Sequence, residues 1–265
     1  MIVCCITFEP DLKRFSKVLH AIDVPLLIID NGSSEKVLKY LASCKAEKVI
    51  YLEENCGIAY ASNIGLRYAL NAGYDYCCLL DQDSILCPNY LQLALSCFNE
   101  APSNTFAIGP FSVNSNNVIS MNNSELHEAD MIIQSGSVVR LEFCNEIGWQ
   151  LDDWFIDLVD LEWFYRAASS GYNIFVSKRL VIDHQLGESS IKFLGKNIAI
   201  HSSKRIYYRA RNTIFALKKG HIPIAVRLRL LAKIIFIGIS LEIRGNEPRM
   251  NYLKALFKGI IDAIL

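Results

Sequence analysis

The 265-residue sequence lacks the cysteine patterns of disulfide-linked, metal-binding and redox proteins. Its nine cysteines form no C-x-x-C motif, and two adjacent pairs, Cys4-Cys5 and Cys77-Cys78, lie inside apolar runs. Neighbours on a strand point to opposite faces, so we expect these side chains to act as small buried hydrophobes. The start, MIVCCITFEP, has no basic leader before its short apolar stretch. We therefore expect a first strand rather than a signal peptide, and reduced thiols in the cytoplasm.

The sequence also lacks a membrane-spanning run and an overall excess of charge. Lys and Arg number 27 in total, as do Asp and Glu. Residues 213–265, however, hold nine basic and three acidic residues, a net charge of +6 that leaves −6 for the rest. The longest uncharged run there, IIFIGISL, is far shorter than the ~20 residues that cross a bilayer. We expect residues 213–265 to form a helical, basic-amphipathic region lying on an anionic membrane interface. Packing on the core, or on a second subunit in a homodimer, is the alternative.

No internal repeat or low-complexity linker interrupts the chain. Up to about residue 100, strand-like apolar runs (IVCCITF, LLIID, VIYLEE, YDYCCLL) alternate with helical segments. Strands that are apolar throughout and separated by helices predict an α/β fold, a mostly parallel sheet with helices on both faces. FAIGPFSV, VISM and MIIQSGSVVRL predict strands of a more mixed region. DDWFIDLVDLEWFYRAASSGY is read as a helix with an acidic start, and HSSKRIYYRARNTIFALKKG as a basic helix.

Polar residues follow the four predicted strands of the first hundred residues. They are Thr7, Asp30, Glu53-Glu54-Asn55 and Asp81-Gln82-Asp83. In parallel α/β sheets, ligands bind at the carboxyl ends of the strands. Two carboxylates two residues apart on an extended segment point the same way and can face one divalent cation. A solvated turn before Pro88 is the alternative for this pair, and a plain turn residue is the alternative for Asp30. No G-x-x-x-x-G-K-[ST] motif is present, which excludes a Walker phosphate loop.

Eight segments in order resemble the family-2 inverting glycosyltransferases of the GT-A fold. They are DNGSS, ENCGIAYASNIG, LLDQDS, QSGSVV, FIDLVDLEWFYRA, GY, DHQLGES and HSSKRIYYRARN. Within the family they are most similar to the bacterial rhamnosyltransferases that build O-antigen and other cell-surface polysaccharides. The resemblance runs from about Ile2 to Asn212 and implies a Rossmann-like GT-A domain over residues 1–212.

The resemblance implies transfer of L-rhamnose from dTDP-L-rhamnose to a lipid-linked saccharide at the cytoplasmic face of the inner membrane. Another donor, such as UDP-galactofuranose or a UDP-hexose, is the alternative within the class. A non-catalytic nucleotide-binding protein docked on the membrane is the alternative from another class. A nucleotidyltransferase is disfavoured because no glycine-rich, lysine-bearing first loop is present. No nucleic-acid partner is expected.

Residue roles also follow from the resemblance. Asp83, with Asp81, would hold Mg²⁺ or Mn²⁺ on the diphosphate, and His184 would join the metal. Asp160 would be the general base, with Asp157, one helical turn earlier, as its rival. The predicted donor contacts are Thr7, Asp30 (at the nucleotide base), Asn55, Gly57, Asn63, Asp81, Gln82, Arg205, Tyr208 and Arg211.

The first strand exit departs from the family pattern. It reads Thr7-Phe8-Glu9-Pro10 where the family often has TYNP. A carboxylate near an anionic donor is repulsive unless it points away, so Thr7 is expected to contact the donor and Glu9 is not. The chemistry itself requires a Lewis acid for the diphosphate leaving group and a base for the acceptor hydroxyl. The carboxylate pair and the separate acidic segment supply candidates for both.

Overall fold

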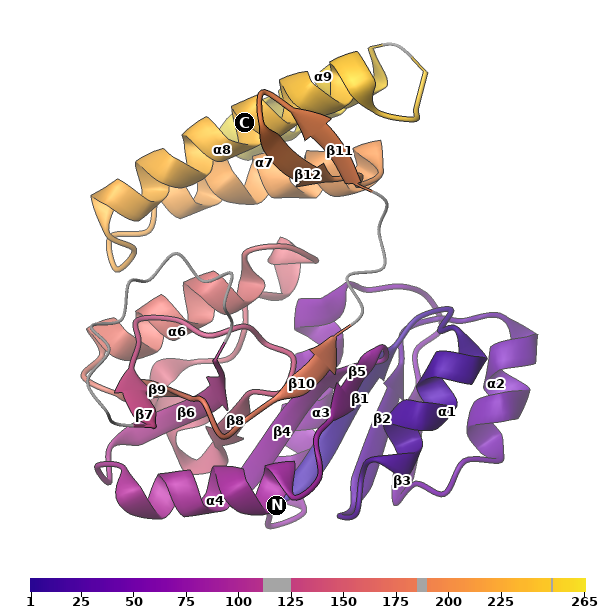
Figure 1. Cartoon of the computed structure of the whole chain (residues 1–265), viewed down its shortest axis with the longest axis vertical. Coiled ribbons are helices and arrows are strands. Elements are labelled where there is room, and N and C mark those ends of the chain that lie inside the picture. The colour runs from indigo at the N-terminus through magenta and orange to yellow at the C-terminus, as the bar shows by residue number, and fades with distance from the viewer. Residues whose placement is uncertain (112–124, 185–189, 249) are drawn as a thin grey trace. The chain divides into compact units, whose positions relative to one another are not determined.

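The computed structural model describes residues 1–111, 125–184, 190–248 and 250–265 (Figure 1). Contacts divide the chain into two compact units. The first comprises Met1–Asp153 and Trp163–Gln185, and the second comprises Trp154–Glu162 and Leu186–Leu265. The expected boundary after residue 212 falls inside a continuous helix, α7 (Ser203–Leu217). Each unit is described by itself.

The first unit is built around an eight-stranded sheet in the order β3-β2-β1-β4-β8-β6-β9-β7. Its strands are β1 (Ile2–Thr7), β2 (Leu26–Asp30), β3 (Lys48–Tyr51), β4 (Tyr76–Asp81), β6 (Thr105–Pro110), β7 (Leu126–Glu128), β8 (Val138–Arg140) and β9 (Asn173–Ser177). Strands β1 to β4 run parallel, as do β6 and β9, whereas β8 and β7 are antiparallel to their neighbours. The predicted mostly parallel sheet is confirmed.

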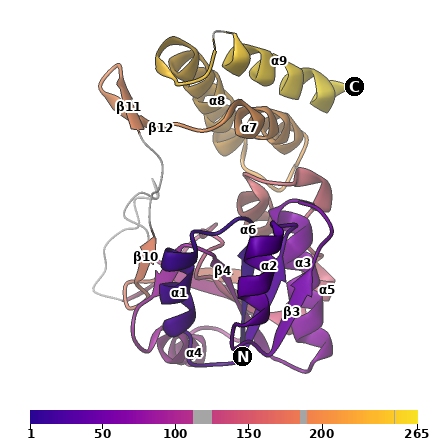
Figure 2. The same cartoon turned by 90° about the vertical axis from the view of Figure 1, so that its right-hand side faces the viewer.

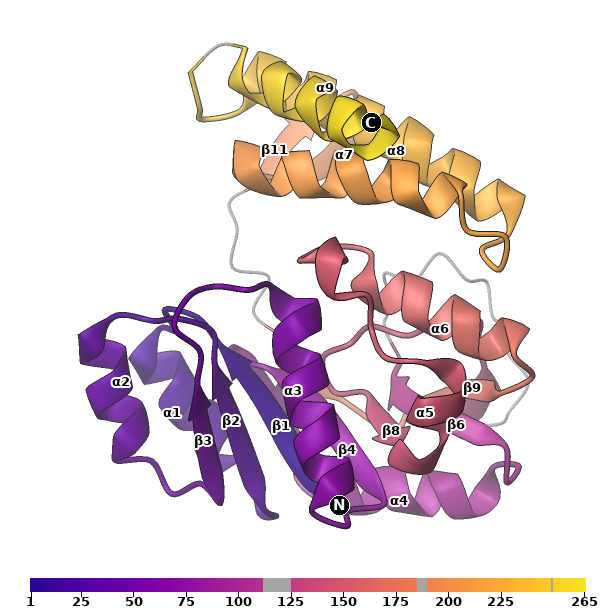
Figure 3. The same ribbon diagram turned by 180° about the vertical axis from the view of Figure 1, so that it is seen from behind.

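Helices cover both faces of this sheet (Figures 1 and 3). They are α1 (Leu12–His20), α2 (Glu35–Ala42), α3 (Ile58–Asn71), α4 (Tyr90–Glu100), α5 (Cys144–Ile147) and α6 (Val159–Ser169). Cys4 and Cys77 lie in the core that α3 and the later part of α6 cover, and Cys5 and Cys78 lie in the core under α1, α2 and α4. Seen from the β3 edge, α1 and α3 flank opposite sides (Figure 2). All nine cysteines are free, so the prediction for the adjacent pairs is confirmed.

The region after α4 departs from the sequence prediction in two places. Of the segment MIIQSGSVVRL only β8 is a strand, because a turn at Gly136 precedes it, closed by the Ser137 N–H on the Gln134 carbonyl (2.9 Å). The helix predicted over DDWFIDLVDLEWFYRAASSGY begins only at Val159. Before it lie a 3₁₀ turn (Asp152–Trp154) and residues with left-handed backbone. Asp157 is therefore not part of a helix, and its predicted place one helical turn before Asp160 is wrong. The predicted strand VISM lies outside the described residues.

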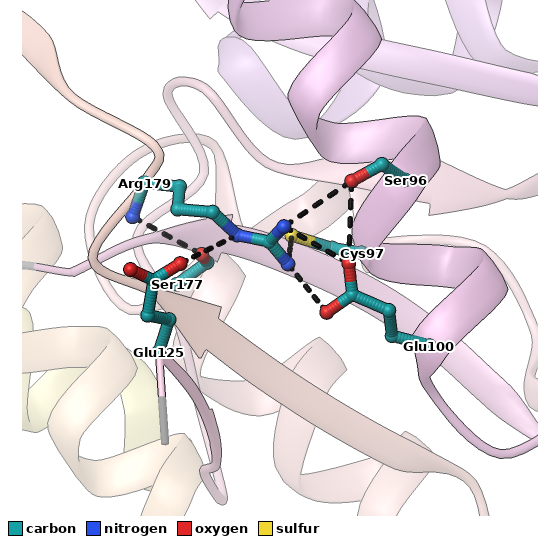
Figure 4. A network of polar contacts seen from close by, with 6 residues as sticks. All are labelled: Ser96, Cys97, Glu100, Glu125, Ser177 and Arg179. Carbon is teal, nitrogen blue, oxygen red and sulfur yellow. Dashed lines mark hydrogen bonds and ion pairs between the residues drawn. The ribbon is translucent and has the colours of Figure 1, made fainter. Parts of the chain in front are cut away.

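Arg179 ties the end of β9 to α4 (Figure 4). Its guanidinium donates to both carboxylate oxygens of Glu100 (2.9 and 2.7 Å) and forms an ion pair with Glu125 at 3.3 Å. The hydrogen bond from Arg179 lowers the pKa of the Glu100 carboxyl below its ordinary value. This network links the end of β9 to the end of α4 and to Glu125.

The second unit contains the hairpin β11 (Ser190–Phe193) and β12 (Lys196–Ala199), and helices α7, α8 (Ile224–Arg244) and α9 (Asn251–Ile264). Ile206, Ile234, Ile237 and Leu256 pack together in its core. The uncharged run IIFIGISL, expected on the membrane interface, is therefore not wholly available to lipid, because α7 and α9 cover Ile234 and Ile237. Among the described residues, no helix is long and apolar enough to cross a membrane.

Candidate functional site

The carboxyl ends of β1, β2 and β4 bring three predicted site residues to one edge of the sheet. Thr7 pairs with Asp30 across β1 and β2, and Ile6 pairs with Asp81 across β1 and β4. Neighbouring strands lie about 5 Å apart, so these side chains emerge close together. The predicted convergence of strand exits is present.

Asp30 is completely buried, and both of its carboxylate oxygens have partners. The Thr7 hydroxyl donates to Oδ1 (3.1 Å), and the Ser33 N–H donates to Oδ2 (2.9 Å). The carboxylate therefore fixes the turn between β2 and α2. Its contact with a nucleotide base stays a prediction. Because the side chain is buried, that contact requires the carboxylate to become accessible to the donor.

A pair of asparagines joins this turn to the loop before α3. The Cys56 N–H donates to Asn31 Oδ1 (2.9 Å), and Asn31 Nδ2 donates to Asn55 Oδ1 (3.2 Å), which also accepts from the Gly57 N–H at 3.0 Å. The two loops touch at Gly32, where a Cβ would lie 2.5 Å from the Glu54 carbonyl carbon. Asn55 thus supports the loop that presents Gly57. Sequence reasoning missed Asn31, although it stands inside the DNGSS motif.

Glu9 is held by the start of α2. Its carboxylate accepts from the Ser34 N–H (2.5 Å) and the Ser34 hydroxyl (3.1 Å), and its own N–H donates to Ser33 Oγ at 2.9 Å. Ser34 is the N-cap residue of α2, where the helix dipole favours a negative charge. The departure from the TYNP pattern is therefore accommodated by a carboxylate that caps a helix.

Gln82 clamps the backbone that follows β1. Its Oε1 accepts from the Phe8 N–H (2.7 Å), and its Nε2 donates to the Phe8 carbonyl at 3.1 Å. The side chain, predicted as a donor contact, thus joins the segment after β4 to the segment after β1. Its partners explain why an amide, with one donor end and one acceptor end, lies between the two aspartates.

The segment after Asp83 pairs with the segment that contains His184. Strand β5 (Ser84–Leu86) runs antiparallel to β10 (Ile182–His184), and Ser84 is the direct partner of His184. On the other side, the Ser135 hydroxyl accepts from the Asp81 N–H (3.1 Å) and donates to Ser84 Oγ (2.7 Å). The backbone of all three predicted metal ligands is therefore brought to one place. The side chain of His184 lies outside the described part of the structure.

Arg14, which sequence reasoning missed, fastens these two segments together. From α1 its Nε donates to the Asp83 carbonyl (3.0 Å), and its Nη2 donates to the Asp183 carbonyl (2.7 Å). Nη1 also pairs with the Asp183 carboxylate at 3.0 Å. Only a long side chain with several donors can reach both segments. One residue therefore couples the Asp83 loop to the strand that ends in His184.

The donor set at this edge suits a hard divalent cation. Carboxylate oxygens are ligands that suit Mg²⁺ and Mn²⁺. Among the side chains that the structure describes, no group of three His, Cys, Asp or Glu is arranged to hold a metal. Asp81 and Asp83 are the two members that can be placed, and His184 is the residue whose backbone lies beside them. Burial, and after it the negative charge of Asp81, raise the pKa of the Cys5 thiol on β1 well above its ordinary value. This cysteine therefore stays protonated.

Asn63 is buried and its amide faces protein partners. Its Nδ2 donates to the Gln150 carbonyl (2.7 Å) and to Asp152 Oδ1 (2.6 Å), and its Oδ1 accepts from the Gln150 N–H at 3.0 Å. Gln150 in turn donates to Gln134 Oε1 (2.9 Å), which belongs to the QSGSVV segment. Asn63 therefore connects two of the motifs, and its predicted donor contact remains a prediction.

In the second unit, the segment with Asp157 and Asp160 lies against α7. Arg205 forms a two-point ion pair with the Asp157 carboxylate (3.0 and 3.3 Å), and the side chain of Asp157 is 11% exposed. The Asp160 Oδ1 accepts from the Leu161 N–H at 2.8 Å in the first turn of α6. Asp160 as the general base, with Asp157 as its rival, stays a prediction.

Tyr208 and Arg211 form an aromatic and cationic stack on the same helix. The Tyr208 ring lies parallel to Phe155, with centroids 4.4 Å apart and planes 9° from parallel. The Arg211 guanidinium lies over the Tyr208 ring at 4.9 Å. In this arrangement Arg205, Tyr208 and Arg211 contact protein groups, and their predicted contacts with a diphosphate stay predictions.

A family comparison assigns the first part of the chain. Residues 2–147 match the model of the family described as glycosyl transferase family 2. The matched residues include the strand exits and the Asp81-Gln82-Asp83 segment, and they end before Asp157 and Asp160. The chain is also 28% identical over 281 residues to a Shigella flexneri protein named dTDP-rhamnosyl transferase RfbF, an alignment that covers 98% of this chain and 93% of the relative.

Solved structures share the fold at low sequence identity. A structure of S. aureus TarS 1–349 in complex with UDP-GlcNAc is 16% identical, with a TM-score of 0.59 over 99% of this chain and 80% of the other. A structure of GalNAc-T7 with UDP, GalNAc and Mn²⁺ is 12% identical, with a TM-score of 0.58 over 88% of this chain. The chain spans about half the length of that protein (54%), and 48% of a longer TarS chain. The expected GT-A fold is confirmed.

Proposed function

Because the chain belongs to glycosyl transferase family 2, we propose that it transfers L-rhamnose from dTDP-L-rhamnose, with inversion, to a lipid-linked saccharide in the synthesis of O-antigen or a similar cell-surface polysaccharide. The observation that carries the proposal is the joining of the Asp81-Gln82-Asp83 exit to the strand that ends in His184. The name of the Shigella flexneri relative, which aligns over nearly the whole chain, supports rhamnose as the sugar.

In this proposal the strand exits bind the donor and a divalent cation. Asp81 and Asp83, with His184, would hold Mg²⁺ or Mn²⁺, which would stabilise the negative charge that grows on the leaving diphosphate. Mn²⁺ in the GalNAc-T7 structure supports a metal for this fold. Arg14 holds the two ligand-bearing segments together through the Asp83 and Asp183 carbonyls, and Gln82 ties the first of them to the backbone of Phe8.

Asp160 is the proposed general base. The acceptor hydroxyl is a weak nucleophile, so a carboxylate must take its proton as it attacks the anomeric carbon. One base acting without a covalent intermediate gives a single displacement and an inverted product. Asp157, whose carboxylate binds Arg205, is its rival for this role.

The C-terminal helices are proposed to lie on the cytoplasmic face of an anionic membrane. Ile224, Leu228, Ile235, Ile239 and Ile243 are all exposed on α8. Their spacings of four and seven residues place them on one face of the helix. Together with the net charge of +6 in residues 213–265, this exposed stripe suits an interface of anionic headgroups and acyl chains. It would also place the enzyme next to a lipid-linked acceptor.

A donor panel tests the sugar. Purified protein is incubated with Mn²⁺, an acceptor extract and dTDP-rhamnose, UDP-galactofuranose, UDP-glucose or UDP-GlcNAc, and nucleoside diphosphate release is measured. Asp160→Asn gives the blank for each donor. Release that depends on dTDP-rhamnose alone is expected. Release from a UDP-sugar, as the TarS complex with UDP-GlcNAc would favour, would replace rhamnose by that sugar and leave the reaction class unchanged.

A further inference from the structure

The backbone just before α6 has an unusual conformation. Phe155, Asp157 and Leu158 have φ angles of 59°, 64° and 63°, and none of them is glycine. Large or branched side chains rarely adopt this left-handed region, and such residues persist only where their surroundings hold them. The segment therefore needs partners that compensate for its conformation.

Asn212 of α7 supplies the central partner. Its side chain is completely buried, and its Nδ2 lies within hydrogen-bond distance of the carbonyl oxygens of Trp154 (2.7 Å), Ile156 (2.8 Å) and Asp157 (2.9 Å). Three carbonyls that point at one amide cannot belong to a regular helix or strand. The amide thus supplies a donor to carbonyls of an irregular segment, in which the Trp154 carbonyl also accepts from the Ile156 N–H (2.7 Å).

Two further residues of α7 contact the same segment. Arg205 binds the Asp157 carboxylate at two points, and Tyr208 stacks on Phe155. Arg205, Tyr208 and Asn212 are spaced by three and four residues, so they lie on one face of α7. All of these contacts lie within the second unit.

We propose that Arg205 and Asn212 are positioning residues that hold Phe155–Leu158 and thereby set the place of Asp160. Helix α6 begins at Val159, immediately after Leu158, and Asp160 is its second residue. The conformation of Leu158 therefore fixes the direction in which the first turn of α6 presents this carboxylate. The inference rests on the proposed role of Asp160 as the general base.

A double-mutant cycle between Asn212 and Asp160 tests this inference. Asn212→Asp keeps the shape of the side chain but replaces the donor by an acceptor facing three carbonyl oxygens. Displacing a catalytic group by about 1 Å can cost about 100-fold in rate, so we expect kcat to fall by about 10- to 100-fold, with the donor KM and the stoichiometry of dTDP binding unchanged. In the Asp160→Asn background the same change should lower kcat by less than about threefold, because its effect on the rate acts through Asp160.

Thr213→Val is the matched control. Thr213 is the next residue of α7, it is also buried, and its hydroxyl donates to the Arg209 carbonyl of the same helix (2.7 Å). This variant loses one buried hydrogen bond without touching Phe155–Leu158, and it should keep wild-type kcat. If Asn212→Asp does not fold, Arg205→Gln enters the same cycle with the same expectation for kcat.

The outcomes separate the two proposals. Equal losses from Asn212→Asp (or Arg205→Gln) in both backgrounds would contradict positioning of this carboxylate. Wild-type rates for Asp160→Asn itself would overturn the proposed base instead. Wild-type rates for Asn212→Asp, with Asp160→Asn inactive, would overturn the positioning role alone.

Discussion

Replacing Arg14 by methionine should weaken the binding of a divalent cation while the protein stays folded. The guanidinium makes hydrogen bonds of 3.0 and 2.7 Å to the carbonyls of Asp83 and Asp183, and an ion pair with the Asp183 carboxylate, whose side chain is 69% exposed. Each hydrogen bond contributes about 1 kcal/mol and the exposed ion pair at most ~0.5 kcal/mol. The change therefore removes about 2–2.5 kcal/mol of the interaction free energy that holds the Asp83 loop to β10. If all of it supports the cation site, Kd for Mn²⁺ rises by up to about 60-fold.

The measurement is a titration with Mn²⁺ in the presence of dTDP, in which free Mn²⁺ is followed by its electron paramagnetic resonance signal. Arg179→Met is the control, because Arg179 is similarly exposed (22% against 17%) and its guanidinium binds Glu100 of α4 and Glu125 (Figure 4). It should lower Tm and leave Kd unchanged. An Arg14→Met protein that binds Mn²⁺ within twofold of wild type, or an equal loss in Arg179→Met, would refute the coupling.

Three other perturbations have defined outcomes. Asp160→Asn should lower kcat by about 10²- to 10⁴-fold with donor binding intact, whereas Asp157→Asn should cost less; the reverse order in steady-state kinetics would exchange their roles. Ile239→Glu, on the exposed face of α8, should weaken binding to anionic vesicles in sedimentation assays. Added salt should weaken the binding of the wild-type protein in part. Equal binding of the wild type to neutral and anionic vesicles, or a dimer that buries α8, would contradict the proposed membrane contact of this helix. Because the Arg179 hydrogen bond holds the folded-state pKa of Glu100 below its unfolded value, Glu100 stabilises the fold above about pH 4, and this is lost as pH falls further. Urea unfolding of Glu100→Gln should therefore show a deficit at pH 7 that closes at acid pH, and a deficit that persists there would argue against the ion pair.

The sheet and its polar edge could be predicted because both leave local signals in the sequence. Apolar runs that alternate with helical segments gave the four parallel strands, and parallel strands place their exits at one edge. The adjacent cysteines split between the two cores for the same reason, since side chains alternate along a strand.

The residues that hold the site together could not be found in this way. Arg14 reaches Asp183, which is 169 residues away in the sequence, and Asn212 reaches Trp154 across 58 residues. Such contacts have no periodicity and depend on tertiary structure alone. A buried amide or a long guanidinium looks like any other polar residue of a helix until the fold is known.

The segment before α6 and the apolar run of α8 show why local pattern misled. The sequence around Asp157 has helical spacing, but three carbonyls turned toward Asn212 are not available to a helix. In α8, hydrophobic residues lie on two faces. Ile234 and Ile237 belong to the core with α7 and α9, whereas Ile235 and Ile239 are exposed. A sequence run does not separate these faces until the packing partners are known.

The most direct test of the central claim is a single reaction followed by NMR. The full chain is mixed with dTDP-rhamnose, Mn²⁺ and a lipid-linked acceptor, and the same mixture is prepared with excess EDTA. We expect dTDP release with a rhamnosyl product whose anomeric configuration is opposite to that of the donor, and no product in EDTA. A product of retained configuration, or full turnover in EDTA, would contradict it.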